Sequence, residues 1–183
     1  MNRRNARLLF LFAVLLLCSL AWLTSPWWLG YVTNAFNRVE NGLYIGGAVD
    51  HPPLGTHAVL NVCEQKDTFI VHPNMWEPFP VNPTVEWLAR TVNFVAEQRA
   101  AGRTVYVHCL AGETRSAAVV VAYLMREHGW HRDEAIAFLK SRRPQMKLPP
   151  YMIHLLDKWQ ETLNVEQSHV FIPDNLHSQK ILC

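Results

Sequence analysis

The chain has 183 residues, enough for one ordinary domain and a short appendage, because most domains run to about 100 to 150 residues. The chain has 17 Lys and Arg and 15 Asp and Glu, so it carries no strong excess of positive charge. This balance argues against a nucleic-acid partner. The four cysteines form no Cys-x-x-Cys pair and have no histidine at ligand spacing, so neither a zinc site nor a disulfide framework is expected. We therefore expect no metal and no cofactor.

An uncharged, leucine-rich run from Leu8 to Leu23 follows three arginines at the N-terminus. Counted through Trp28, it has about the 20 residues that a helix needs to cross a bilayer. This pattern is typical of a signal anchor that holds the N-terminus in the cytoplasm and carries the following domain across the membrane. The alternative is a cleaved signal peptide with its apolar core at 8–18 and a small-x-small site at 19–21, which would leave a secreted or periplasmic protein.

The rest of the chain alternates between strand and helix patterns. Short apolar runs predict strands within 39–47, 58–63 and 105–108, and helical periodicity predicts helices at about 83–102, 116–127, 133–141 and 150–163. The run at 105–108 is too short for a helix and reads as a buried central strand, whereas 116–127 suits a buried helix. We therefore predict an α/β fold with a central, mostly parallel sheet flanked by helices.

These patterns divide the chain into three parts. Residues 1–34 are the anchor or signal peptide with a linker, 35–165 form the globular domain, and 166–183 are a polar tail without a clear period.

A phosphate-binding loop is predicted between the central strand and the buried helix. It is His108, Cys109, Leu110, Ala111, Gly112, Glu113, Thr114, Arg115 and Ser116. Backbone N–H groups and a helix N-terminus converge at such a junction and bind an anion, so residues 110–115 are expected to hold the phosphate. Arg115 adds a planar fork suited to two phosphate oxygens, and Gly112 lets the backbone turn.

The chemistry of this loop centres on Cys109. A helix N-terminus and Arg115 both favour thiolate over thiol, and a thiolate can attack phosphorus to give a phosphocysteine intermediate. Ser116 can donate a hydrogen bond to the sulfur and help it leave in the second step. His108 is expected to orient the loop rather than to act as a base.

The motif HCxxGxxRS resembles the signature of the cysteine-based protein tyrosine phosphatases, and within them the small dual-specificity branch. The resemblance extends from about Arg38, where Asn41 to Gly46 are similar to the opening strand of that branch, to the final helix. It implies the phosphatase fold and hydrolysis of phosphotyrosine, with phosphoserine and phosphothreonine as further substrates. The partner would be a phosphorylated protein or a small phosphate ester.

The general acid is less clearly marked. This family usually supplies an Asp from a loop about thirty residues before the cysteine, to protonate the leaving oxygen. Here the region 74–83 contains no Asp. Glu77 is the predicted acid, and Asp67 is the alternative. If Asn82 is the true equivalent, its amide cannot donate the proton, and the enzyme would favour good leaving groups such as aryl phosphates.

The loop composition also bears on the substrate. Branches that act on phosphoinositides tend to place Lys or Arg inside the loop, where this chain has neutral residues and Glu113. If Glu113 faces the ligand, it repels additional phosphates and favours a singly phosphorylated group; it can equally point to solvent. The predicted anchor keeps a lipid phosphate as the second choice.

Two further hypotheses concern the cysteine and the reaction class. By resemblance, Cys63 is a predicted redox partner that could form a protective disulfide with Cys109, although a strand-end cysteine is also ordinary core. The missing Asp leaves open a module that binds phosphate without turnover. A cysteine acyl-transfer enzyme would need a histidine base, and no motif places one.

Overall fold

The computed structural model describes residues 14, 19 and 35–170. Apart from residues 14 and 19, the predicted membrane segment lies outside the described residues. Among the helices that are described, none is both long enough and apolar enough to cross a membrane. The described residues from Phe36 to Val170 belong to one compact unit, which holds the predicted loop.

A five-stranded sheet forms the centre of this unit, with the strand order β1-β2-β5-β3-β4. The strands are β1 (Phe36–Glu40), β2 (Leu43–Gly46), β3 (Ala58–Asn61), β4 (Asn74–Trp76) and β5 (Val105–His108). Only β1 runs antiparallel to its neighbour, so the predicted mostly parallel sheet is confirmed. The two edge strands β1 and β4 were not predicted, because their side chains are mostly half-buried or exposed and therefore form no apolar run.

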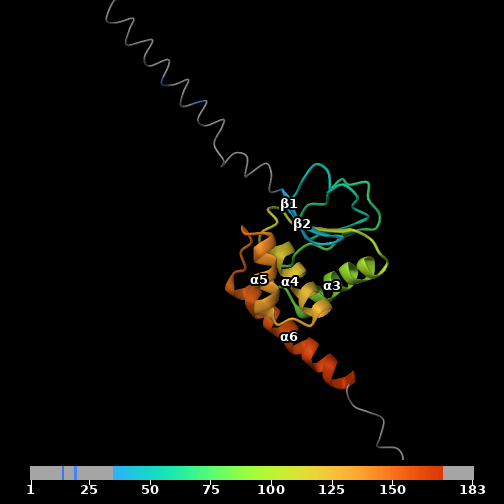
Figure 1. The fold of residues 1–183 in the computed structure, drawn as a ribbon, viewed down its shortest axis with the longest axis vertical. Helices are drawn as coiled ribbons and strands as arrows, with labels where there is room; N and C mark the ends of the chain where they lie inside the picture. The colour runs from blue at the N-terminus through green and yellow to red at the C-terminus, as the bar shows by residue number, and fades with distance from the viewer. Residues whose placement is uncertain (1–13, 15–18, 20–34, 171–183) are drawn as a thin grey trace, which may run out of the picture. The chain divides into compact units, whose positions relative to one another are not determined.

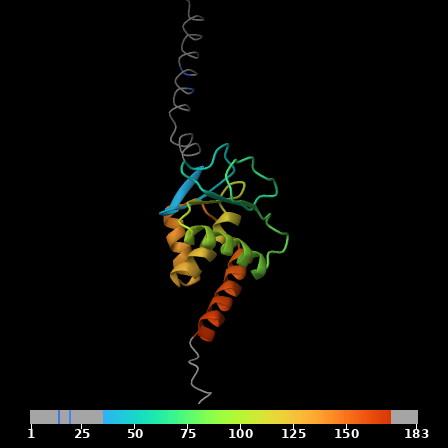
Figure 2. The same ribbon diagram turned by 90° about the vertical axis from the view of Figure 1, so that its right-hand side faces the viewer.

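Three helices contact the sheet and a fourth packs on those three, and all lie on the same side of the sheet (Figure 1 and Figure 2). They are α3 (Val85–Ala100), α4 (Arg115–His128), α5 (Arg132–Arg142) and α6 (Pro150–Val170). The predicted α/β fold with flanking helices is therefore confirmed. The central helix α4 contacts the other three, and its residues from Ser116 to Met125 are all buried. Such burial on every side requires small and apolar side chains, which is the composition of this segment.

The ends of the helices follow local signals. Pro83 precedes α3, and the Thr84 side chain accepts a hydrogen bond from the Trp87 N–H as an N-cap. Helix α4 ends at Gly129, which adopts a left-handed conformation with φ +66°. Helix α6 is longer than predicted and continues through the expected domain boundary at 165. Among the side chains of α6 whose burial is described, Leu163 is the last buried apolar one, so the extension was not predicted from an apolar period.

Among the residues that the structure describes, loops rather than a helix cover the opposite face of the sheet. The ring of Phe69, from the loop between β3 and β4, packs against Tyr106 and His108 of β5. Tyr106 and His108 stack on each other, 5.2 Å apart, on this face. A cavity of about 600 Å³ lies here, lined among others by Asp50, Asp67 and Leu110. It reaches the rim of the predicted phosphate loop, to which Leu110 belongs.

Candidate active site

The predicted loop joins the central strand β5 to the buried helix α4. Its last residue before the helix, Thr114, occupies the N-cap position but makes no capping bond with its side chain. The first N–H groups of α4 are therefore not satisfied by that side chain and can be offered to a ligand. An anion is the ligand that such a helix end favours.

Cys109 lies at the bottom of the loop, with 2% of its surface exposed. Its Sγ accepts a hydrogen bond from the Gly112 N–H at 3.2 Å and lies 3.3 Å from the Ser116 Oγ. Burial works against a thiolate, but the hydrogen bonds from Ser116 and Gly112 and the charge of Arg115 outweigh it and lower the pKa of Cys109. The sulfur is thus prepared as a nucleophile.

The outer side of the loop is fixed by hydrogen bonds to its carbonyl groups. The Leu110 carbonyl accepts one from the Ala48 N–H, and the Glu113 carbonyl accepts one from the Lys147 N–H, each at 2.9 Å. Gly112 has φ +67°, and a Cβ at this position would lie 2.2 Å from the Gly46 carbonyl carbon. Only glycine therefore fits the turn.

Arg115 is held at the mouth of the loop by a residue that the sequence did not reveal. Its Nη1 lies 2.6 Å from the Glu64 Oε2, and the side chains are 20% and 60% exposed. Glu64 directly follows Cys63 at the end of β3, a position beside the central strand, but nothing in its sequence context indicates a partner. A phosphate that binds here meets a guanidinium that is already ion-paired.

The structure pairs Glu77 with an arginine outside the loop. Its carboxylate forms an ion pair with Arg90 of α3, at 2.9 Å, and its backbone N–H bonds to the Asn61 carbonyl. Glu77 would have to leave Arg90 to reach an ester oxygen above Cys109. The role of general acid stays a prediction.

Asp67, the alternative acid, is engaged beneath the loop. Its Oδ2 lies 3.2 Å from the His108 Nε2, and its Oδ1 accepts hydrogen bonds from the Asn74 side chain and the Phe69 N–H. Burial raises the pKa of Asp67, but the bonds from Asn74, Phe69 and His108 more than offset it and lower the pKa. A carboxyl held in its charged form is a poor proton donor, so the structure favours a role for Asp67 in orienting His108.

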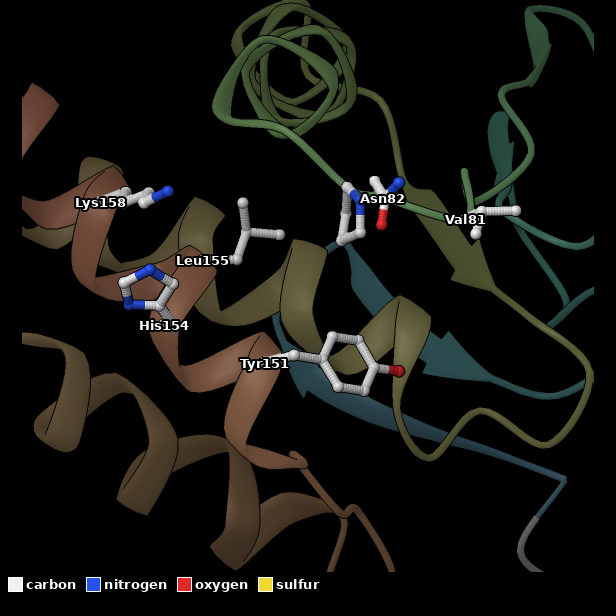
Figure 3. Close-up of a pocket in the computed structure, with 7 residues that line it drawn as sticks. Val81, Asn82, Tyr151, His154, Leu155 and Lys158 are labelled. Carbon is white, nitrogen blue, oxygen red and sulfur yellow. The ribbon is translucent and has the colours of Figure 1, made fainter.

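Asn82 lies apart from both carboxylates. It lines a groove of about 320 Å³ between the 81–83 segment and the first half of α6, with Tyr151, His154 and Lys158 across from it (Figure 3). No carboxylate belongs to this lining. If Asn82 is the equivalent of the family's acid, the groove offers no acidic substitute for it.

Cys63 and Cys109 are both free thiols and both buried. Burial and the neighbouring Cys109 raise the pKa of Cys63 to about 11. Cys63 is therefore a protonated thiol at neutral pH, whereas the pKa of Cys109 is shifted in the opposite direction. Its role as a redox partner stays a prediction.

Glu113 has a lysine side chain close to its carboxylate. Its carboxylate lies 3.6 Å from the Lys147 Nζ, and the Lys147 side chain is 78% exposed. The negative charge that was expected to repel additional phosphates therefore has a cation beside it.

A second arginine, Arg143, was also missed as a site residue. It is 1% exposed and donates hydrogen bonds to the carbonyls of Ala111 and Gly112. The sequence shows it only as part of the pair Arg142 and Arg143 before Pro144, where a surface position would be the default expectation for a charged residue.

A nucleophilic cysteine cradled at the N-terminus of a buried helix, with an arginine at the mouth, defines the class of cysteine-based phosphatase domains. Residues 43–162 match the family model described as the dual specificity phosphatase, catalytic domain. The chain belongs to this family, as its resemblance at the loop predicted.

The similar proteins span several members of this family. The human dual specificity protein phosphatase 12 is 34% identical over 126 residues, which cover 61% of this chain and 37% of that protein. The rat phosphatidylglycerophosphatase and protein-tyrosine phosphatase 1 is 36% identical over 81 residues, which cover 44% of this chain and 42% of that protein. The chain thus spans less than half the length of these relatives.

A solved structure agrees with the fold. The mouse putative dual specificity phosphatase complexed with zinc tungstate superposes with a TM-score of 0.65 at 28% identity, covering 73% of this chain and 91% of that one.

Proposed function

We propose that this chain is a phosphatase that hydrolyses phosphate monoesters, phosphotyrosine above all, through a phosphocysteine intermediate. The observation that carries the proposal is the environment of Cys109, whose sulfur is hydrogen-bonded by the Gly112 N–H and faces the Ser116 hydroxyl. Phosphoserine and phosphothreonine, with poorer leaving groups, are the slower substrates. This chemistry requires a thiolate and a preformed anion-binding loop, and it does not require a metal.

In the first step, the Cys109 Sγ forms a bond to phosphorus while the ester P–O bond breaks in line with it. The loop N–H groups and Arg115, which exchanges Glu64 for phosphate, stabilise the charge on the equatorial oxygens. The leaving oxygen takes its proton from a general acid or from water. We assign the acid to Glu77, after its ion pair with Arg90 opens.

In the second step, water attacks the phosphocysteine, the S–P bond breaks and inorganic phosphate is released. The sulfur leaves as a thiolate, and the buried Ser116 hydroxyl can donate a hydrogen bond to it at that moment. The enzyme returns to its starting state without a cofactor.

The decisive experiment compares the full chain with its Cys109→Ser variant. We expect release of phosphate from para-nitrophenyl phosphate and from a phosphotyrosine peptide that is lost in the variant, and a covalent phosphoenzyme that rapid denaturation traps. Binding of phosphopeptide without Cys109-dependent turnover would show instead a non-catalytic phosphate-binding module.

A lipid phosphate monoester is the second candidate substrate. The rat relative carries phosphatidylglycerophosphatase in its name, and Leu110 in the loop is 61% exposed, which suits an apolar neighbour of the phosphate. Hydrolysis of phosphatidylglycerophosphate in mixed micelles should be compared with that of the phosphotyrosine peptide. A kcat/KM for the lipid well above that for the peptide would reverse the order of the two substrates.

The N-terminal pattern supports a membrane-anchored enzyme whose catalytic domain lies on the extracytoplasmic side. Alkaline carbonate extraction should leave the full chain in the membrane, and added protease should digest the domain only from that side. A soluble product that begins near residue 22 would identify a cleaved signal peptide instead. Digestion of the domain from the cytoplasmic side only would contradict this orientation.

A further inference from the structure

We propose that Arg143 is a positioning residue of the phosphate loop, which holds two consecutive peptide groups so that the N–H groups of Gly112 and Glu113 face the sulfur and the bound phosphate. The inference deepens the proposed function and rests on it for the identity of the anion. The role of the arginine in ordering the loop can be measured without turnover.

The contacts of the guanidinium carry this inference. Its Nη2 donates to the Ala111 carbonyl at 3.0 Å, and its Nε donates to the Gly112 carbonyl. Its Nη1 donates to the Asn37 side-chain oxygen of β1 at 2.7 Å. The side chain therefore connects the loop, across 31 and 32 residues of sequence, to the end of α5 and to the first strand.

The bonds to the two carbonyl groups also fix the direction of the N–H groups in the same peptide units. In a trans peptide group the C=O and the N–H point in opposite directions. The Ala111 carbonyl belongs to the same peptide group as the Gly112 N–H, which donates to the Cys109 Sγ. The Gly112 carbonyl likewise fixes the Glu113 N–H. By holding both carbonyls outward, Arg143 keeps both N–H groups turned inward.

The remaining outward carbonyls are held by backbone groups. Ala48 bonds to the Leu110 carbonyl, and Lys147 bonds to the Glu113 carbonyl. Four consecutive loop carbonyls, from 110 to 113, thus each accept a bond from outside the loop. Arg143 is the side chain that supplies the middle two.

Close packing leaves little freedom between the arginine and the loop. A Cβ on Gly112 would lie 2.6 Å from the Arg143 Nη2. A planar guanidinium presents two donors in a fixed fork, whereas an ammonium is a single point of charge on a flexible stem. Lysine at position 143 could therefore keep the charge but not hold both peptide groups.

The test uses the full chain with Arg143→Lys, and Arg142→Lys as the matched control on an exposed neighbour. The first readout is the pH dependence of Cys109 alkylation by iodoacetamide, followed by mass spectrometry of its peptide. The second is the protection of Cys109 against alkylation by inorganic phosphate.

For Arg143→Lys we expect the alkylation midpoint to rise by about one pH unit and the phosphate affinity to fall about tenfold, as a loosened hydrogen bond to the thiolate implies. Arg142→Lys should change neither. The proposal is overturned if Arg143→Lys folds and keeps its alkylation midpoint within about 0.3 pH unit and its phosphate affinity within about twofold of the parent.

Asn37→Ala covers the case in which Arg143→Lys does not fold, because it removes the bond from the guanidinium to β1 and leaves the bonds to the loop in place. We expect a smaller change of both readouts in the same direction. A lowered melting temperature with both readouts unchanged would show that Arg143 serves stability alone and overturn the proposal. Absence of turnover in the parent would reject the proposed function but would leave the alkylation result standing.

Discussion

Ser116→Ala should separate the two chemical steps. The Ser116 hydroxyl is fully buried and lies 3.3 Å from the Cys109 sulfur. A hydrogen bond to a charged group contributes about 1.5 to 3 kcal/mol, and the sulfur regains its negative charge as it leaves phosphorus. Loss of the donor should therefore slow hydrolysis of the phosphocysteine by roughly 10- to 100-fold. Formation of the intermediate, in which the thiolate is consumed, should change much less.

The same change affects the thiolate before the reaction. The folded protein holds the pKa of Cys109 below its usual value, and removing one donor raises it again. Because the thiolate is the reactive form above this pKa, the acidic limb of kcat/KM should move to higher pH.

The assay is a stopped-flow measurement with para-nitrophenyl phosphate. We expect a burst of one equivalent of nitrophenol followed by slow turnover in Ser116→Ala. Ser141→Ala on α5, whose hydroxyl bonds only to the Phe138 carbonyl, is the matched control and should show parent kinetics. Turnover of Ser116→Ala at the parent rate without a burst would refute the role assigned to this hydroxyl.

Glu77→Gln should remove the alkaline limb of kcat and slow alkyl phosphates more than aryl phosphates, whereas Asp67→Asn should keep that limb; the reverse pattern would exchange the two assignments. Peroxide treatment should crosslink Cys63 to Cys109, as a non-reducing peptide map would show. In Cys63→Ser, added thiols should then no longer restore the activity that peroxide removes. A peroxide-treated parent protein without the crosslink contradicts this. Glu113→Lys should raise kcat/KM for multiply phosphorylated ligands several-fold relative to para-nitrophenyl phosphate, because it replaces a charge that Lys147 only partly offsets; an unchanged ratio would mean that Glu113 does not face the ligand.

The phosphate loop could be predicted from sequence because all its parts are contiguous. The strand, the cysteine, the glycine turn and the buried helix follow one another between 105 and 128, and each has its own local signal. The parallel sheet followed from the alternation of buried strands and helices. The family resemblance rested on the same contiguous residues.

The contacts that complete the site could not be predicted, because they join distant segments. Arg143 reaches a loop 31 and 32 residues earlier in the chain, and Arg115 meets Glu64 from the loop that follows β3. Arg90 pairs with Glu77, and His108 pairs with Asp67, so these contacts determine whether either carboxyl can donate a proton. The spacing of residues in the sequence indicates neither contact. The edge strands and the end of α6 were missed for a different reason, since their sequences lack an apolar period.

Arg115 meets an incoming anion while Glu64 still holds it. A ligand that takes the guanidinium leaves the Glu64 carboxylate, 60% exposed, without its cation. A zwitterionic inhibitor with an ammonium group next to its phosphonate would replace that cation as it binds. Such a compound should be more selective for this chain than a simple phosphonate, because it recognises the acid at the mouth as well as the cradle below it.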